Sequence, residues 1–240
     1  MVWKLLPTIS APMPLQMALD ELLFESQKKD PQAPVLRFYI SSEPWISVGC
    51  SFRGEADLSK SGLISKNPQV PVCRRVTGGG CVLHGVDLIF FLAARVQADP
   101  ENLGAVRTSY ARIHEGVKMG LQGCGLDLKF YSNQEKLPKG NDCFDFPVES
   151  DLAWKGKKIA GGAQKRSEGV LLHHESISIP PGVVREDLIR TIRRGLEHVF
   201  RMSLRNADLN PEIFFQAQKL QKTTMSRSGI TDSRPQGIKQ

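Results

Sequence analysis

The 240-residue chain has few cysteines and no long hydrophobic run. Its five cysteines (Cys50, Cys73, Cys81, Cys124 and Cys143) are odd in number and form no Cys-x-x-Cys pair. This spacing argues against a disulfide framework and a zinc site, and it is typical of a protein in a reducing cytoplasm. No basic N-terminal segment leads into an apolar run, and no stretch approaches the ~20 apolar residues of a membrane helix. We therefore expect a soluble cytoplasmic protein with no signal peptide, no membrane partner and no metal site.

The sequence also lacks the charge pattern of a nucleic-acid-binding protein. The formal net charge is +7, which by itself would suit a polyanionic partner. However, the basic residues are spread along the chain, and aromatic residues do not alternate with them. Two of the basic clusters lie inside glycine-rich motifs, where a cation suits a carboxylate, a phosphate or an acidic partner domain. We therefore expect no nucleic-acid partner.

The remaining composition, 40% hydrophobic and 24% charged, is that of a globular domain. We predict a single domain over residues 1–222 and a disordered tail over residues 223–240. Apolar residues at helical spacing predict helices over residues 14–29, 57–63, 102–124, 185–200 and 211–221. Strand-prone segments occupy residues 35–40, 45–50, 70–76, 81–96, 126–131, 151–156 and 169–179. Because these elements follow no regular βαβ rhythm, we expect a mixed α/β (α+β) fold with a largely antiparallel sheet flanked by helices.

The first informative motif is the glycine-rich segment Arg-Arg-Val-Thr-Gly-Gly-Gly-Cys-Val-Leu-His at residues 74–84. Three consecutive glycines after a strand allow the backbone to approach a bound group and to turn its N–H groups toward an oxygen. No Lys-Ser/Thr follows the glycines, which excludes a P-loop, and no Gly-x-Gly-x-x-Gly opens a helix. A glycine-rich hairpin with a surface arginine pair remains the structural alternative.

The second motif, at residues 156–166, places Lys158 before the small residues Ile-Ala-Gly-Gly-Ala. One cation beside a wall with almost no side-chain bulk suits a ligand whose carbonyl or phosphate lies against the backbone. A lysine at such a wall can serve as a base or as a carbonyl anchor. We interpret the neighbouring Lys155 and Lys157 as parts of a basic turn.

Taken together, the motifs resemble the biotin/lipoate attachment superfamily, specifically the lipoate-protein ligases and octanoyltransferases. The similarity spans residues 14–200 and includes the segments 17–21, 36–39, 47–49, 74–84, 158–166 and 169–177 in the order of the family. It implies a catalytic domain that wraps a mixed sheet around an acyl site. It also implies a lipoyl carrier domain as partner, with acyl carrier protein or free lipoate or octanoate as the acyl source.

Cys143 decides between the two chemistries of this family. It lies in the segment Cys-Phe-Asp-Phe-Pro, which is similar to the nucleophile segment of the octanoyltransferases. Those enzymes take octanoate from acyl carrier protein through a cysteine thioester and need no cofactor. The resemblance thus implies catalytic roles for Cys143, as nucleophile, and for Lys158, as carbonyl anchor and base. The other four cysteines are interpreted as small buried hydrophobes.

Three alternatives stay open. Gly80, where the cysteine-dependent enzymes often carry arginine, is ligase-like and favours an ATP- and Mg-dependent lipoate-protein ligase. A non-catalytic ligand-binding module would keep the glycine motifs without needing Cys143. A biotin ligase fits less well, because the lysine-glycine motif matches the lipoate branch. Under each enzymatic interpretation the expected substrate-binding residues are Arg74, Arg75, Thr77, Gly78, Gly79, Gly80, His84, Gly161, Gly162, Ala163 and Gln164.

Overall fold

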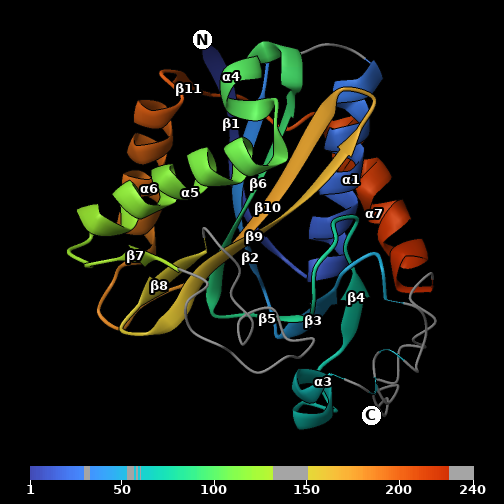
Figure 1. The fold of residues 1–240 in the computed structure, drawn as a ribbon. Helices are drawn as coiled ribbons and strands as arrows, with labels where there is room; N and C mark the ends of the chain where they lie inside the picture. The colour runs from blue at the N-terminus through green and yellow to red at the C-terminus, as the bar shows by residue number, and fades with distance from the viewer. Residues whose placement is uncertain (30–32, 53–56, 58, 60, 132–150, 227–240) are drawn as a thin grey trace.

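The computed structural model describes residues 1–29, 33–52, 57, 59, 61–131 and 151–226 (Figure 1). Its helices are α1 (Met13–Lys29), α3 (Gly62–Lys66), α4 (Pro100–Leu103), α5 (Val106–Gly123), α6 (Arg185–Val199) and α7 (Pro211–Ser226), with a 3-10 turn at Val96–Ala98. Its strands are β1 (Val2–Ala11), β2 (Val35–Ser41), β3 (Trp45–Val48), β4 (Val72–Arg74), β5 (Val82–His84), β6 (Asp87–Arg95), β7 (Lys129–Phe130), β8 (Leu152–Trp154), β9 (Lys157–Ser167), β10 (Val170–Ser178) and β11 (Ser203–Asn206).

The strands of the described residues form two sheets. The larger has the order β11-β1-β2-β6-β10-β9-β8-β7, and the smaller has the order β4-β3-β5. In the larger sheet, β1 runs parallel to β2 and to β11, and every other neighbouring pair is antiparallel. The predicted mixed, largely antiparallel sheet flanked by helices is therefore confirmed.

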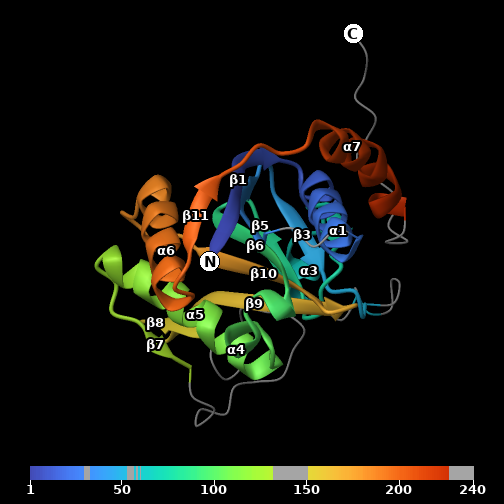
Figure 2. The ribbon, with the colours of Figure 1, turned by 90° about the horizontal axis from the view of Figure 1, so that it is seen from above.

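The larger sheet lies between two layers of helices (Figure 2). Helices α5 and α6 cover one face, where Leu171 and Ile177 of β10 join the larger core cluster. Helices α1 and α7 cover the other face, to which Val170 and Leu172 contribute. Because successive strand residues point to opposite faces, odd-numbered residues of β10 face α5 and even-numbered residues face α1.

Some elements differ from the predictions. Strand β1 was not predicted, since Pro7 interrupts its apolar alternation, and the pairing with β2 shifts register between Leu6 and Ile9 to accommodate it. Strand β11 was also missed, because four residues carry little periodicity. Helix α3 begins at Gly62, after the Ser61 cap, and so overlaps only the end of the helix predicted over 57–63, of which residues 58 and 60 lie outside the described residues. Helix α7 extends beyond the predicted end at residue 221.

Most of the predicted tail, residues 227–240, lies outside the described residues. The predicted single domain over residues 1–222 stays a prediction. Among the helices that the structure describes, none is both long and apolar enough to span a bilayer.

Candidate functional site

A pocket lies between the α1-facing side of the larger sheet and the smaller sheet. Its apolar lining comes from Met13, Met17, Tyr39, Val82 and Ile89. The rest of its lining comes from β3, the segment after β4, β5, β9 and β10, and consists of Ser47, Arg75, His84, Gly161, Gly162, Ala163, His174, Glu175 and Ser176. The lining therefore combines apolar side chains that suit a hydrocarbon chain with polar groups that suit a head group.

Lys158 lies next to Gly161, one of the residues that line this pocket. Its side chain is 3% exposed, and its Nζ forms an ion pair of 2.7 Å with Asp151 Oδ2. A Cβ added at Gly161 would collide with Cε and Nζ of Lys158. The absence of a side chain at Gly161 therefore allows the lysine ammonium to lie against the backbone that lines the pocket.

Gly162 has a different role from the one predicted. We expected both glycines to leave room for a ligand, but Gly162 stands opposite Glu175 in the β9–β10 register and on the α5 side. A Cβ there would lie 2.6 Å from Glu175 Oε2 and would collide with the His173 ring. Only the backbone of Gly162 lines the pocket, and its missing side chain makes room for buried polar groups on the other face.

Arg75 supports the triple-glycine loop from inside. Its guanidinium donates to the carbonyl oxygens of Gly78 (2.7 Å) and Gly80 (2.8 Å) and to Ser47 Oγ (3.0 Å). Gly79 has a φ of +89°, a left-handed conformation that favours glycine. The loop therefore takes its shape from one buried arginine and from a backbone conformation at Gly79 that only glycine adopts without strain.

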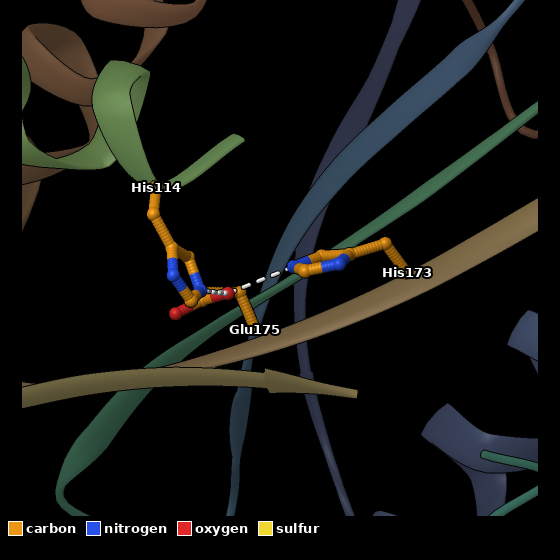
Figure 3. A group of neighbouring side chains, drawn as sticks. All are labelled: His114, His173 and Glu175. Atoms are coloured by element: carbon orange, nitrogen blue, oxygen red, sulfur yellow. Dashed lines mark hydrogen bonds and ion pairs between the residues drawn. The ribbon is translucent and has the colours of Figure 1, made fainter. Parts of the chain in front are cut away.

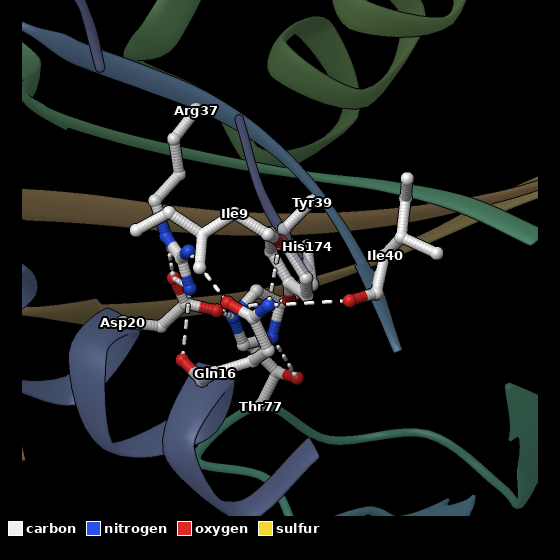
Figure 4. Close-up of polar contacts among 8 residues, drawn as sticks. All are labelled: Ile9, Gln16, Asp20, Arg37, Tyr39, Ile40, Thr77 and His174. Carbon is white, nitrogen blue, oxygen red and sulfur yellow. Dashed lines mark hydrogen bonds and ion pairs between the residues drawn. The ribbon is translucent and has the colours of Figure 1, made fainter. Parts of the chain in front are cut away.

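Helix α1 reaches the pocket through a buried polar network (Figure 4). Asp20 Oδ1 accepts a hydrogen bond from Arg37 Nε (2.7 Å), and Oδ2 accepts one from the Tyr39 hydroxyl (2.9 Å) and lies 3.0 Å from His174 Nε2. Burial alone would raise the pKa of Asp20, but Arg37 and His174 hold it below its ordinary value. His174 Nδ1 in turn lies 3.1 Å from Thr77 Oγ1. The network thus couples α1, β10 and the glycine loop.

His84 forms a second buried chain on the pocket wall. Its Nε2 lies 2.8 Å from Ser47 Oγ, and its Nδ1 lies 2.7 Å from Asp87 Oδ2, which also accepts from Ser176 Oγ at 2.6 Å. Burial works to raise the pKa of Asp87, yet the neighbouring His84, with Ser176, keeps it below the ordinary value. Both ring nitrogens of His84 are therefore engaged within the protein, which fixes the ring as part of the wall.

A more open groove adjoins the pocket and shares Arg75 with it. It is lined by Glu21, Cys50, Arg74, Arg75, Val76, Gly78, Gln164 and Lys165. Arg74 donates to the backbone carbonyls of Cys50 and Phe52 and so holds the segment after β3. The arginines and Lys165 give this groove the charge that an anionic group requires.

The structure thus gathers most of the predicted site residues around two adjoining spaces. Arg75, His84 and residues 161–163 line the pocket, whereas Arg74, Gly78 and Gln164 line the groove. Thr77 reaches the pocket through His174. Cys143, the predicted nucleophile, lies outside the described residues.

Sequence reasoning gave no site role to Asp20, Arg37, Ser47, Asp87 or Asp151. A signal was present, because Asp20 and Arg37 interrupt the apolar pattern of a helix and a strand. Such interruptions indicate buried polar partners.

The sequence matches the family described as the lipoyl protein ligase A/B catalytic domain over residues 12–192. The chain belongs to this family. It is similar to octanoyltransferase LipM of an Exiguobacterium species, with 37% identity over 188 residues that cover 74% of this chain and 66% of that protein. It is also similar to LipM of Carboxydothermus hydrogenoformans, with 31% identity over 203 residues that cover 83% of this chain and 73% of the relative.

Solved structures of this family share the fold. A structure from work on a bi-partite lipoate protein ligase and its E2 lipoyl domain from Thermoplasma acidophilum superposes with a TM-score of 0.70 at 20% identity, covering 94% of each chain. At this identity the likeness shows the fold alone. The chain spans about two thirds of the length of the LipM relatives it matches.

Proposed function

We propose that this protein transfers an octanoyl or lipoyl group to a specific lysine of a lipoyl carrier domain. The observation that carries the proposal is the Lys158 ammonium, which lies over Gly161 beside a pocket that also has an apolar lining. A carbonyl head group against the glycine wall would lie beside this cation, and Met13 and Met17 suit an alkyl chain. The LipM relatives support the same activity.

The proposed reaction proceeds through Cys143 in two steps. The Cys143 thiolate attacks the carbonyl carbon of octanoyl-acyl carrier protein, and the carrier thiol leaves, so one thioester replaces another of similar energy. The amine of the lipoyl-domain lysine then attacks the acyl-enzyme. An amide forms as the thioester C–S bond breaks, the amine gives up a proton to Lys158, and Cys143 leaves as the thiolate. No cofactor is required.

Lys158 has two roles in this scheme. As the ammonium it stabilises the thiolate and the oxygen of the acyl carbonyl. It gives its proton to the departing carrier thiolate and then accepts the proton that the attacking amine releases. Asp151 keeps the side chain at the pocket, because their 2.7 Å ion pair is buried. Asp151 is thus a positioning residue for the proposed base.

The second candidate is an ATP-dependent lipoate-protein ligase. The groove lined by Arg74, Arg75 and Lys165 favours it, because these cations fit the phosphates of ATP. A lipoate-protein ligase A with bound ATP has the same fold, at a TM-score of 0.70. In this alternative Lys158 contacts an acyl-adenylate, Mg²⁺ accompanies the nucleotide, and Cys143 takes no part in the chemistry.

Intact mass spectrometry separates the two candidates. The protein is incubated with octanoyl-acyl carrier protein, and in parallel with octanoate, ATP and Mg²⁺. We expect a mass increase of one octanoyl group in the first mixture, removed by hydroxylamine and absent in Cys143→Ser. The matched control Cys50→Ser removes an exposed cysteine of the groove and should retain the adduct.

A lipoyl domain added to each mixture and octanoylated only with ATP and free acid would establish the ligase, because an acyl-adenylate is not bonded to the enzyme. An adduct that still forms in Cys143→Ser would show that Cys143 is not the nucleophile. If neither mixture modifies the enzyme or a lipoyl domain, the protein is a binding module rather than an acyltransferase.

A further inference from the structure

A second cluster of ionisable side chains lies on the opposite face of the larger sheet from the pocket (Figure 3). His173 and Glu175 are odd-numbered residues of β10 and point toward α5, from which His114 meets them. The side chains of all three are at most 1% exposed. Glu175 also belongs to the lining of the pocket, but the three side chains meet on the α5 side of the sheet, and the proposed acyl transfer does not use them.

The three side chains converge on one point. Glu175 Oε2 lies 3.0 Å from His114 Nε2 and 2.8 Å from His173 Nε2. One nitrogen from each histidine and one carboxylate oxygen all lie within 4.8 Å of one another. Figure 3 shows both imidazole rings directed at the carboxylate. Gly162 creates the space, since any side chain at this position would collide with both β10 residues.

The second oxygen of Glu175 indicates that the cluster is incomplete. Oε1 is buried and has no hydrogen-bond partner among the described residues. Both histidines contact the same carboxylate oxygen, Oε2, and this leaves Oε1 without a partner in the described part of the chain. A buried carboxylate with an unpartnered oxygen is costly, and its charge calls for a cation.

We propose that His114, His173 and Glu175 bind one divalent transition-metal ion of the Zn²⁺ class. Two imidazoles and one carboxylate form a donor set typical of zinc, whereas Mg²⁺ and Ca²⁺ prefer oxygen ligands alone. Each imidazole binds through the Nε2 lone pair, so the proton now on Nε2 moves to Nδ1 and the ring stays neutral. The metal replaces the two hydrogen bonds to Glu175 and lets Oε1 become a ligand.

Gln164 provides the support that such a site needs. Its side-chain amide lies 3.2 Å from His173 Nδ1 and also contacts Ser109 Oγ. When Nδ1 carries the proton, the amide group of Gln164 rotates so that its oxygen accepts a hydrogen bond from Nδ1–H. Because the cluster joins α5 to β10, a metal would fix the strand that presents His174 to the pocket on its other face.

The test uses the full-length protein, freed of metal with a chelator. After addition of Zn²⁺ and desalting, we expect about one zinc per chain by elemental analysis and a higher melting temperature. Co²⁺ should give visible absorption bands of a nitrogen- and oxygen-bound ion. Glu175→Gln and His114→Ala should lose stoichiometric zinc, and Gln164→Ala should bind 10- to 100-fold more weakly.

His198→Ala is the matched control, because His198 is the exposed histidine of helix α6 and should leave zinc binding unchanged. The measurement on the wild-type protein stands even if a variant fails to fold. A wild-type protein that retains no zinc and whose melting temperature responds to neither ion would overturn the proposal, as would full zinc retention in His114→Ala. Either result would mean that the cluster only joins α5 to β10 through hydrogen bonds. Failure of the acyl-transfer assay would leave this proposal intact.

Discussion

Replacing Lys158 should separate its catalytic role from its structural one. The ammonium and the Asp151 carboxylate are both at most 3% exposed and 2.7 Å apart. At an effective dielectric constant of about 20, their attraction is roughly 6 kcal/mol, most of which offsets the desolvation of the two charges. Lys158→Met leaves the carboxylate buried without this partner, so we expect the free energy of unfolding to fall by about 3–5 kcal/mol.

The double variant Lys158→Met/Asp151→Asn removes both charges, so it should recover much of that stability while staying inactive. Urea unfolding measures stability, and octanoyl transfer to a lipoyl domain measures activity. Lys157→Met, an exposed neighbour, is the control and should match the wild type in both. Transfer by the double variant at wild-type rates would refute the catalytic role. An unchanged unfolding free energy in Lys158→Met would refute the buried ion pair.

Two further predictions concern the groove. Gly78→Val places a side chain in the groove and should block transfer, but it should not unfold the protein, because a Cβ there meets nothing within 4 Å. Gly79→Val should also lower the melting temperature, because the φ of Gly79 is +89° and a Cβ there would approach Arg75. Equal melting temperatures for the two variants would contradict this reasoning. Burial raises the pKa of the Cys73 thiol to about 12, so at pH 8 roughly one thiol in ten thousand is ionised. Iodoacetamide should therefore label the exposed Cys50 and spare Cys73, as peptide mass mapping would show.

The fold class was predictable from the sequence because most elements carry a strong local pattern. Helix α1 and strand β10 lie within a residue or two of their predicted bounds, since long apolar periodicities depend on neighbouring residues alone. Strands β1 and β11 were not predictable in this way. Their pairing joins the two ends of the domain, and Pro7 or short length obscures the local signal.

The sequence by itself predicted two segments whose residues line the pocket and the groove. The two glycine motifs and Lys158 were identified because runs of glycine beside a cation are rare unless the backbone must approach another group. What each glycine accommodates was decided only by the tertiary structure. Gly161 makes room for Lys158, whereas Gly162, one residue on, makes room for Glu175 on the opposite face.

The partners of the buried charges were likewise decided by tertiary structure. Asp20 meets His174 across 154 positions of sequence, and His114 meets Glu175 across 61. No local pattern links such residues, because their contacts arise only when the helices pack on the two faces of the sheet. The sequence therefore determined the chemical groups and their local backbone, and the packing of α1 and α5 against β10 determined which groups meet.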